Sequence, residues 1–228
     1  MTCRQLLFAL LLLMPGAKAH QALPLDTESP EAAKPLVIAT SLTRSSLMIN
    51  IEQQLRVAYR KLGYQISLAQ LPSGRSLSMT NAGMYDGELF RIEAVGAEFP
   101  NLLKVPVPLA RIELKAFTLA ARPLTGDWQH ERKLRIGMVR GFRLAMDYPV
   151  SGQVVLVTSA QQAVQMLLQD RIDVLLDDEA TIRAVLGPEF SRLQMAPEAL
   201  ASAELFHFIH RKHQDLLKPL SDALRQLK

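Results

Sequence analysis

Short apolar runs alternate along this chain with stretches in which apolar residues recur every three or four positions. The first run covers 36–39, and the stretch after it places apolar side chains on one face between Asn50 and Gly63. We predict a strand followed by a helix, with Asn50 as the N-cap and Gly63 just beyond the helix end. An alternation of this kind is typical of a parallel sheet covered by helices.

The same alternation continues to the end of the chain, with one interruption. Residues 113–121 form a longer extended run, and proline and glycine break the chain after it. Ser159, with Gln162 three residues later, predicts a capping box at a helix start. The other predicted elements are strands at 66–69, 86–92, 134–139, 154–157, 172–176 and 205–209, and helices at 76–83, 178–186 and 210–227.

This order predicts an α/β protein of two lobes with mixed, mostly parallel sheets, joined at a hinge by two crossings of the chain. We assign 36–120 and 201–228 to lobe 1 and 121–200 to lobe 2. About 209 residues follow the first nineteen, enough to bury such a core.

The first nineteen residues have the pattern of a cleaved signal peptide. Arg4 precedes the apolar run 6–14, and Ala17 and Ala19 are the small residues expected before a cleavage site. The run is too short for a membrane span, which needs about 20 apolar residues. We therefore predict a signal peptide at 1–19, a flexible leader at 20–35, and a periplasmic protein with no stable membrane insertion.

Composition excludes several kinds of site. The only cysteine, Cys3, lies in the predicted signal peptide, so the remainder has neither disulfide nor thiol. Without Arg4 and Lys18, 24 basic residues face 22 acidic ones, too mild a surplus to indicate nucleic-acid binding. We expect no cofactor and no metal.

Three histidines, at 207, 210 and 213, suggest two alternatives. Their spacing allows a metal site, but the first lies in a predicted strand and the others in the turn after it. We favour a solvated turn. No motif of a hydrolase, a phosphate-binding loop or a dinucleotide site occurs in the sequence.

Six segments carry a resemblance to a known family, at 71–77, 83–92, 100–109, 134–141, 170–179 and 210–227. In their order and spacing they resemble periplasmic solute-binding proteins of family 3, the amino-acid-binding type. Two further landmarks are Trp128 and Asp170, the latter standing where the family often has a glycine. The resemblance implies two α/β lobes that close on a ligand, in a divergent member of the family. Two departures are the loop 40–46, which lacks an aromatic residue, and the missing threonine-x-x-arginine clamp.

Candidate ligand-binding residues follow predicted strands, where open α/β sheets place their ligands. Arg75 and Arg91 suit a small carboxylate, because the guanidinium fork donates two charge-assisted hydrogen bonds. Asp178 suits an ammonium group. The remaining candidates are Glu88 and the strand-to-helix turn formed by Gly141, Phe142 and Arg143.

Each of these residues also has a purely structural interpretation. Arg75 suits a loop cap, Arg91 suits an ion pair with Glu88 or Glu93, and Asp178 suits a helix N-cap. The sequence does not decide between these interpretations and ligand binding.

Three functions remain. The first is a monomeric, non-catalytic binding protein that traps a small carboxylate or amino-acid-like solute for a transporter permease or a sensor kinase. The second is an interaction module that kept the fold and lost the ligand. The third is a periplasmic enzyme such as a dehydratase, with Glu88 or Asp178 as its acid or base.

Overall fold

The computed structural model describes residues 34–124 and 126–227. The predicted signal peptide lies outside these residues, as does most of the predicted leader. Lys34 and Pro35 already belong to the first strand, where they pair with Tyr64 and Gln65. The fold therefore begins two residues earlier than the sequence pattern predicts.

The secondary structure follows the predicted alternation. From the start to the first crossing, the elements are β1 (Lys34–Thr40), α1 (Ser46–Lys61), β2 (Tyr64–Gln70), α2 (Ser73–Asn81), β3 (Gly87–Ile92), α3 (Val95–Glu98) and β4 (Leu102–Leu119). The later elements are η1 (Trp128–His130), β5 (Arg135–Val139), α4 (Arg143–Met146), β6 (Gln153–Val157), α5 (Ala160–Leu168), β7 (Val174–Asp177), α6 (Glu179–Leu186), η2 (Gly187–Arg192), β8 (Leu193–Met195), β9 (Ala201–His210), η3 (Arg211–Leu216) and α7 (Leu217–Arg225).

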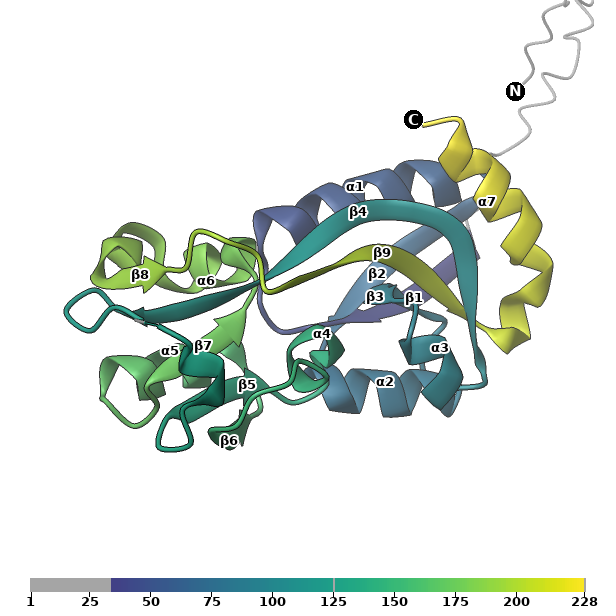
Figure 1. Ribbon diagram of the computed structural model, residues 1–228. Coiled ribbons are helices and arrows are strands. Elements are labelled where there is room, and N and C mark those ends of the chain that lie inside the picture. The colour runs from purple at the N-terminus through teal and green to yellow at the C-terminus, as the bar shows by residue number, and fades with distance from the viewer. Residues whose placement is uncertain (1–33, 125, 228) are drawn as a thin grey trace, which may run out of the picture. The chain divides into compact units, whose positions relative to one another are not determined.

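One long strand, β4, belongs to both halves of the fold (Figure 1). Its residues from Leu102 to Leu114 pair with β9, and those from Lys115 onward pair with β7 and β8. The strand order is β2-β1-β3-β9-β4-β7-β5-β6, with β8 also on β4. We call the sheet of β2, β1, β3, β9 and the first part of β4, with its helices, the first lobe. The second lobe is the sheet of the last part of β4 with β7, β5, β6 and β8, and its helices. The predicted two-lobed α/β class is confirmed, whereas the residue limits assigned above stay a prediction.

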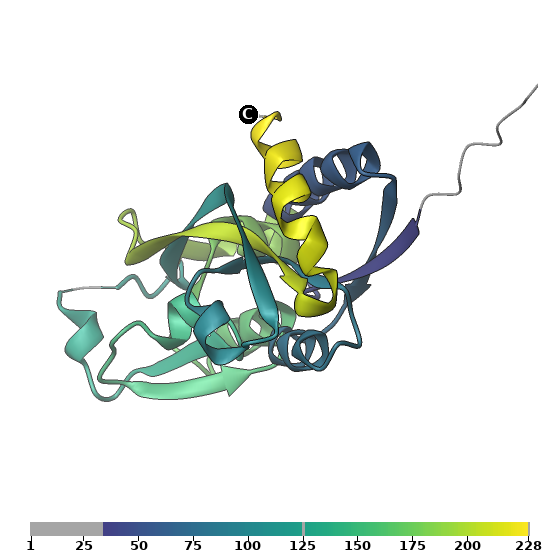
Figure 2. The same ribbon diagram turned by 90° about the vertical axis from the view of Figure 1, so that its right-hand side faces the viewer.

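Helices cover both faces of the first-lobe sheet. Figures 1 and 2 show α1 and α7 together on one face and α2 and α3 on the other. Ile38 of β1 and Leu55 of α1 are fully buried on the face that α1 and α7 cover. Leu77 of α2 and Phe208 of β9 are buried on the opposite face. Burial on both faces explains why β1 shows no polar alternation after Val37.

The second lobe has the same arrangement on a smaller scale. All four residues of β7 are buried. Leu175 packs on the side of α5 and α6, whereas Val174 and Leu176 pack on the opposite side with Trp128. A strand buried on both faces reads as a continuous apolar run, which is why the sequence pattern located it.

Two predicted helix starts are corrected. Helix α1 is capped by Ser45, whose Oγ accepts from the Met48 N–H at 3.3 Å, so Asn50 lies inside the helix. Helix α2 begins at Ser73 rather than at 76. The predicted cap of α5 is confirmed, because Ser159 Oγ accepts from the Gln162 N–H at 3.2 Å.

The histidine prediction is wrong for His207, which is fully buried in β9 rather than solvated. Its Nε2 lies 2.8 Å from the Tyr59 hydroxyl. Burial lowers its pKa to about 4, so the imidazole is neutral at pH 7. Within 34–124 and 126–227 there is no cluster of ligating side chains that suits a metal ion, and no helix long and apolar enough to cross a bilayer.

The β3–β9 pairing depends on a glycine. A Cβ on Gly87 would clash with the backbone oxygen of Phe208, which cannot move aside as a flexible side chain would. We expect Gly87→Ala to destabilise the protein by about 1–3 kcal/mol through overpacking, measured by urea unfolding. Gly96→Ala is the control, since its Cβ would meet Phe208 Cε1 at an ordinary 3.5 Å. Equal stability of the two variants would contradict this account.

Candidate functional site

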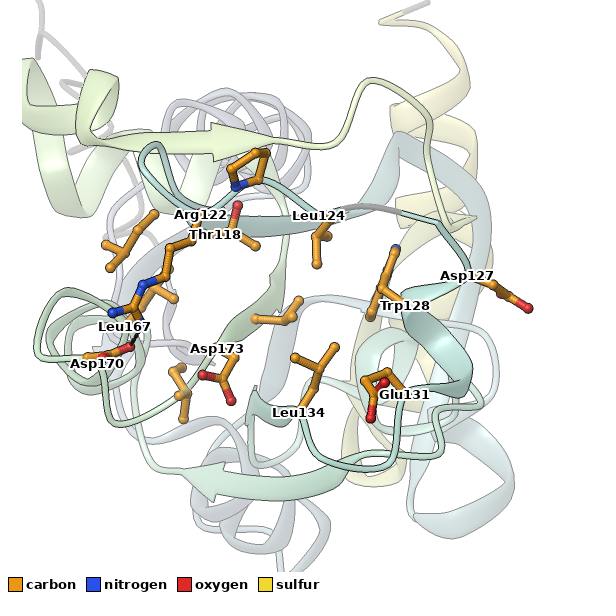
Figure 3. A pocket seen from close by; sticks show the side chains of 14 residues that line it. Thr118, Arg122, Leu124, Asp127, Trp128, Glu131, Leu134, Leu167, Asp170 and Asp173 are labelled. Carbon is orange, nitrogen blue, oxygen red and sulfur yellow. Dashed lines mark hydrogen bonds and ion pairs between the residues drawn. The ribbon is translucent and has the colours of Figure 1, made fainter.

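A charged cavity within the second lobe is not the candidate site. It has a volume of about 390 Å³ and lies between Arg122, Trp128 and Asp173 (Figure 3). Three of its charged residues are paired, because Arg122 pairs with Asp170 and Arg135 Nη2 lies 2.7 Å from Asp173 Oδ1. Every residue that lines it comes from Thr118 to Val174, so it does not join the two lobes.

A second cavity, of about 80 Å³, lies where the lobes meet. We call it the cleft cavity. From the first lobe it is lined by Ser41, Leu42, Thr43, Ser45, Leu47, Pro72, Ser73, Phe90, Arg91 and Ile112, and from the second by Val139, Phe142, Thr158, Ser159, Ala160, Asp177, Asp178 and Thr181. These are mainly the ends of β1, β3, β5, β6 and β7 and the helix starts that follow them, the usual ligand position in open α/β sheets.

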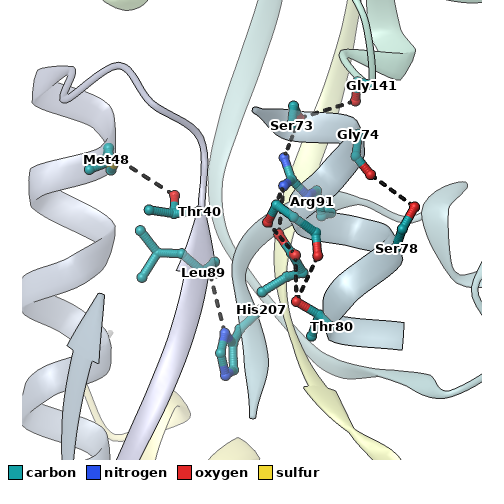
Figure 4. Close-up of polar contacts among 12 residues, drawn as sticks. Thr40, Met48, Ser73, Gly74, Ser78, Thr80, Leu89, Arg91, Gly141 and His207 are labelled. Carbon is teal, nitrogen blue, oxygen red and sulfur yellow. Dashed lines mark hydrogen bonds and ion pairs between the residues drawn. The ribbon is translucent and has the colours of Figure 1, made fainter. Parts of the chain in front are cut away.

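Arg91 lies in this cavity, but its hydrogen bonds to other described residues are made within the first lobe. Its Nη2 donates to Glu88 Oε2 at 2.6 Å and to Ser76 Oγ at 3.2 Å, and its Nη1 donates to Ser73 Oγ at 3.0 Å (Figure 4). Glu88 is fully buried, and its Oε1 accepts from Ser76 at 2.5 Å and from Thr80 at 2.9 Å. The pair is therefore a buried, hydrogen-bonded ion pair.

Two adjacent carboxylates occupy the second-lobe side of the cavity. Asp177 and Asp178 are 4% and 7% exposed. Asp177 Oδ1 accepts from the Asp178 N–H at 2.8 Å, and Asp178 Oδ1 caps α6 by accepting from the Thr181 N–H at 2.9 Å. In the part of the chain that the structure describes, neither carboxylate has a basic side chain within ion-pair distance.

Burial determines the protonation of this acidic pair. Burial first, and then the neighbouring Asp178 charge, raises the pKa of Asp177 well above its ordinary value. Burial also raises the pKa of Asp178, although the hydrogen bond from Thr181 opposes the shift. The folded protein without a ligand therefore pays a desolvation cost to keep two charges here.

The structure brings together three of the predicted site residues, Arg91, Phe142 and Asp178, in the cleft cavity. Glu88 lies behind Arg91, and Arg75 is exposed on α2 outside the lining. The turn that contains Gly141 and Arg143 borders a smaller neighbouring cavity of about 40 Å³.

The two outer residues of that turn contact the first lobe rather than line the cleft cavity. Gly141 packs against the start of α2, where a Cβ would lie 2.7 Å from the Gly74 nitrogen. Arg143 Nη2 pairs with Glu98 at 2.8 Å and with Asp147 at 3.0 Å. The backbone N–H groups of Gly141 and Phe142 donate within the turn region, to Met146 Sδ at 3.1 Å and to the Val139 carbonyl at 3.0 Å.

Sequence reasoning missed Asp177, Thr43 and Ser73 as cavity residues. Asp177 is the last residue of an apolar strand, so its position one residue before the recognised Asp178 was the available signal. Thr43 lies in the loop before α1, and Ser73 is the first residue of α2. Both helices begin earlier than predicted, so neither residue was recognised as lying at a helix start.

The fold is shared with solved binding proteins. The arginine-bound, truncated form of ArgBP from T. maritima superposes with a TM-score of 0.67 at 14% identity, covering 85% of this chain and 96% of that one. An ancestral arginine-binding protein gives a TM-score of 0.71 at 12% identity, covering 86% and 93%. The substrate-binding protein of an amino acid ABC transporter gives 0.68 at 11%, covering 85% and 92%. The fold is periplasmic-binding-protein-like.

In sequence, the chain is 27% identical over 179 residues to an uncharacterized protein of Shewanella oneidensis, covering 75% of this chain and 68% of that protein. No protein-family model matches the sequence. The likeness to the periplasmic-binding-protein-like structures, at under 25% identity, establishes the fold and leaves the ligand open.

The Arg91–Glu88 pair should be structural. Because Arg91→Ala leaves the Glu88 charge buried without its partner, we expect a loss of about 3–5 kcal/mol in unfolding free energy. Arg75→Ala, on the exposed face of α2, should change stability by less than about 0.5 kcal/mol.

The double variant Arg91→Met with Glu88→Gln should recover part of that loss, because neither charge is then left unpaired. Denaturant unfolding of the unchanged protein, Arg91→Met, Glu88→Gln and the double variant measures the coupling. Additive losses in the double variant would contradict a direct ion pair.

The Asp177 carboxylate should destabilise the unliganded protein at neutral pH. A carboxyl whose pKa is raised on folding stabilises the fold when protonated and loses that contribution as pH rises above its ordinary pKa of 3.8. We expect Asp177→Asn to raise the melting temperature at pH 7 by a few degrees, equivalent to about 1–3 kcal/mol, and the gain to shrink toward pH 4.

Asp173→Asn is the matched control with the opposite sign. The hydrogen bond from the Arg135 guanidinium lowers the pKa of Asp173, so its charge stabilises the fold above pH 3.8. Calorimetric melting from pH 4 to pH 8 would measure both variants. A lower melting temperature for Asp177→Asn at pH 7 would overturn the assignment of an unfavourable charge.

Proposed function

We propose that the protein is a non-catalytic, periplasmic solute-binding protein that traps a small polar solute between its lobes. The observation that carries the proposal is the cleft cavity, which both lobes line and into which Asp177 and Asp178 bring carboxylates without a basic partner among the described residues. Solved proteins of the same fold include the substrate-binding protein of an amino acid ABC transporter. A transporter permease is therefore the partner we propose, with a sensor kinase as the alternative.

Contacts across the cleft support closure of the lobes around a solute. Thr43 Oγ1 lies 3.5 Å from Gln161 Oε1 of α5, and Ser73 Oγ lies 3.5 Å from the Gly141 carbonyl. Phe142 packs against the cores of both lobes. A cavity of 80 Å³ is smaller than the several hundred Å³ of typical ligand sites, so a solute larger than a few atoms requires the lobes to separate before they close on it.

The enzyme alternative has little support in the geometry. Glu88 is fully buried behind Arg91, where a solute in the cavity does not reach it. Asp178 is engaged as the cap of α6. The second alternative, a ligand-free interaction module, is consistent with the small cavity and becomes an outcome of the test below.

The test combines a thermal-shift screen with a measurement of lobe movement. A solute present at 100 times its Kd should stabilise the protein by about 2.7 kcal/mol, equivalent to several degrees in melting temperature. Cysteines introduced at the exposed Val57 of α1 and Val154 of β6 would carry spin labels for distance measurement. We expect a stabilising solute to change or narrow the distance distribution between them.

The control for this test is a pair of labels within one lobe, at Val57 and Met84, which is also exposed. Their distance should stay constant when the solute binds. If no solute among amino acids, dicarboxylates, amines and sugars changes melting temperature or distance, the ligand-free module replaces the proposed function.

A further inference from the structure

The charges that line the cleft cavity do not balance, and the reason lies first in Arg91. A guanidinium has five N–H donors. Both donors of Nη2 are used by Glu88 and Ser76, and one donor of Nη1 is used by Ser73. The Nε atom has no partner but is shielded from contact with solvent. Of the two N–H groups without a partner, Nε is shielded, so only one, on Nη1, can face the cavity, and Arg91 cannot offer a carboxylate the usual pair of parallel hydrogen bonds.

The helix starts at the cavity are also occupied. Helix N-termini attract anions through their free N–H groups. Ser45 caps α1, Ser159 caps α5, and Asp178 supplies its own negative charge at the start of α6. The start of α2 is covered by the backbone of Gly141 from the second lobe. Each helix start at the cavity therefore already has one of the protein's own groups against it.

The acidic pair has no such compensation. The charged residues of the cavity lining are Arg91, Asp177 and Asp178. Glu88 neutralises Arg91 at 2.6 Å, which leaves the two adjacent aspartates as the unbalanced charge. Their position at less than 10% exposure means that a charged ligand group would meet them with little competition from water. The remaining lining is hydroxyl-bearing or apolar.

We infer that the ligand of the cleft cavity is a small organic cation, a primary amine or guanidinium, held by Asp177 and Asp178 and needing no carboxylate of its own. This inference rests on the proposed function, and it replaces the expectation that Arg91 binds a ligand carboxylate. Asp177 supplies the charge that no other described residue balances, and Asp178 supplies a second acceptor at the start of α6.

The experiment uses ligands that differ by one charged group. Norvaline is the zwitterion, butylamine is the same molecule without its carboxylate, and valerate is the same molecule without its ammonium. Arginine and agmatine form a second, guanidinium-bearing pair. Calorimetric titration at pH 7.5 should show the amine of each pair binding at least as tightly as its amino acid, with no binding of valerate.

Variants then locate the cation. Asp177→Asn and Asp178→Asn keep the side-chain shape and the hydrogen bond that each oxygen accepts, and each should weaken amine binding at least tenfold. Glu204→Gln, an exposed acid of β9 outside the cavity lining, is the control and should leave affinity unchanged. Unchanged amine affinity in both aspartate variants would overturn the assignment.

The outcomes separate this inference from the proposed function. If valerate or norvaline binds and butylamine and agmatine do not, the cation assignment is wrong and solute binding stands. The same holds if only an uncharged solute from the wider screen binds. If no compound in either set binds, both proposals fall together.

Discussion

The backbone pairing of β4 is the constraint on which the rest of the structure depends. This one strand supplies the edge for β9 in the first lobe and for β7 and β8 in the second. The return crossing lies beside it, because the Leu200 N–H donates to Leu114 and the Ala196 N–H donates to Ala116. Since both crossings are joined by backbone hydrogen bonds, the lobes can change their angle only by bending these two segments together. The cleft cavity lies beside this pair of segments, with Ile112 of β4 in its lining.

The two sides of the cleft use buried charge differently. On the first-lobe side, Glu88 and Arg91 satisfy one another and three hydroxyl groups, which costs desolvation but leaves a rigid, neutral wall. On the second-lobe side, Asp177 and Asp178 are desolvated without a counter-charge in the described chain. A fold selected for stability alone has no use for the second arrangement, and unfavourable charge in a cleft is a common sign of a site completed by something else.

Most of the fold was predictable from the sequence because a strand buried on both faces is a continuous run of apolar residues. The buried strands β1, β5 and β7 are continuous apolar runs, and each was located to within two residues. The strand β4 was less predictable, because Lys104, Pro106 and Pro108 interrupt its first part, and only its second part was recognised. Among the residues that line the cleft cavity, strand ends pointed to Arg91 and Asp178. An ion pair of Arg91 with Glu88 was one of the predicted alternatives, but its burial was not predictable, because the two side chains meet only through a β-bulge between these residues.

That bulge links the fold to the chemistry of the cleft. In a regular strand, residues three apart point to opposite faces, so Glu88 and Arg91 would not meet. The irregularity between them, opposite Phe208 and Phe206 of β9, adds a residue and turns both side chains to the same side, toward α2. There Ser73, Ser76 and Thr80, spaced at three and four along α2, complete their hydrogen bonds. The pairing of β3 with β9 thus places Arg91 against Glu88. Asp177 and Asp178 of the second lobe therefore remain the charged residues of the cavity lining without a basic partner among the described residues.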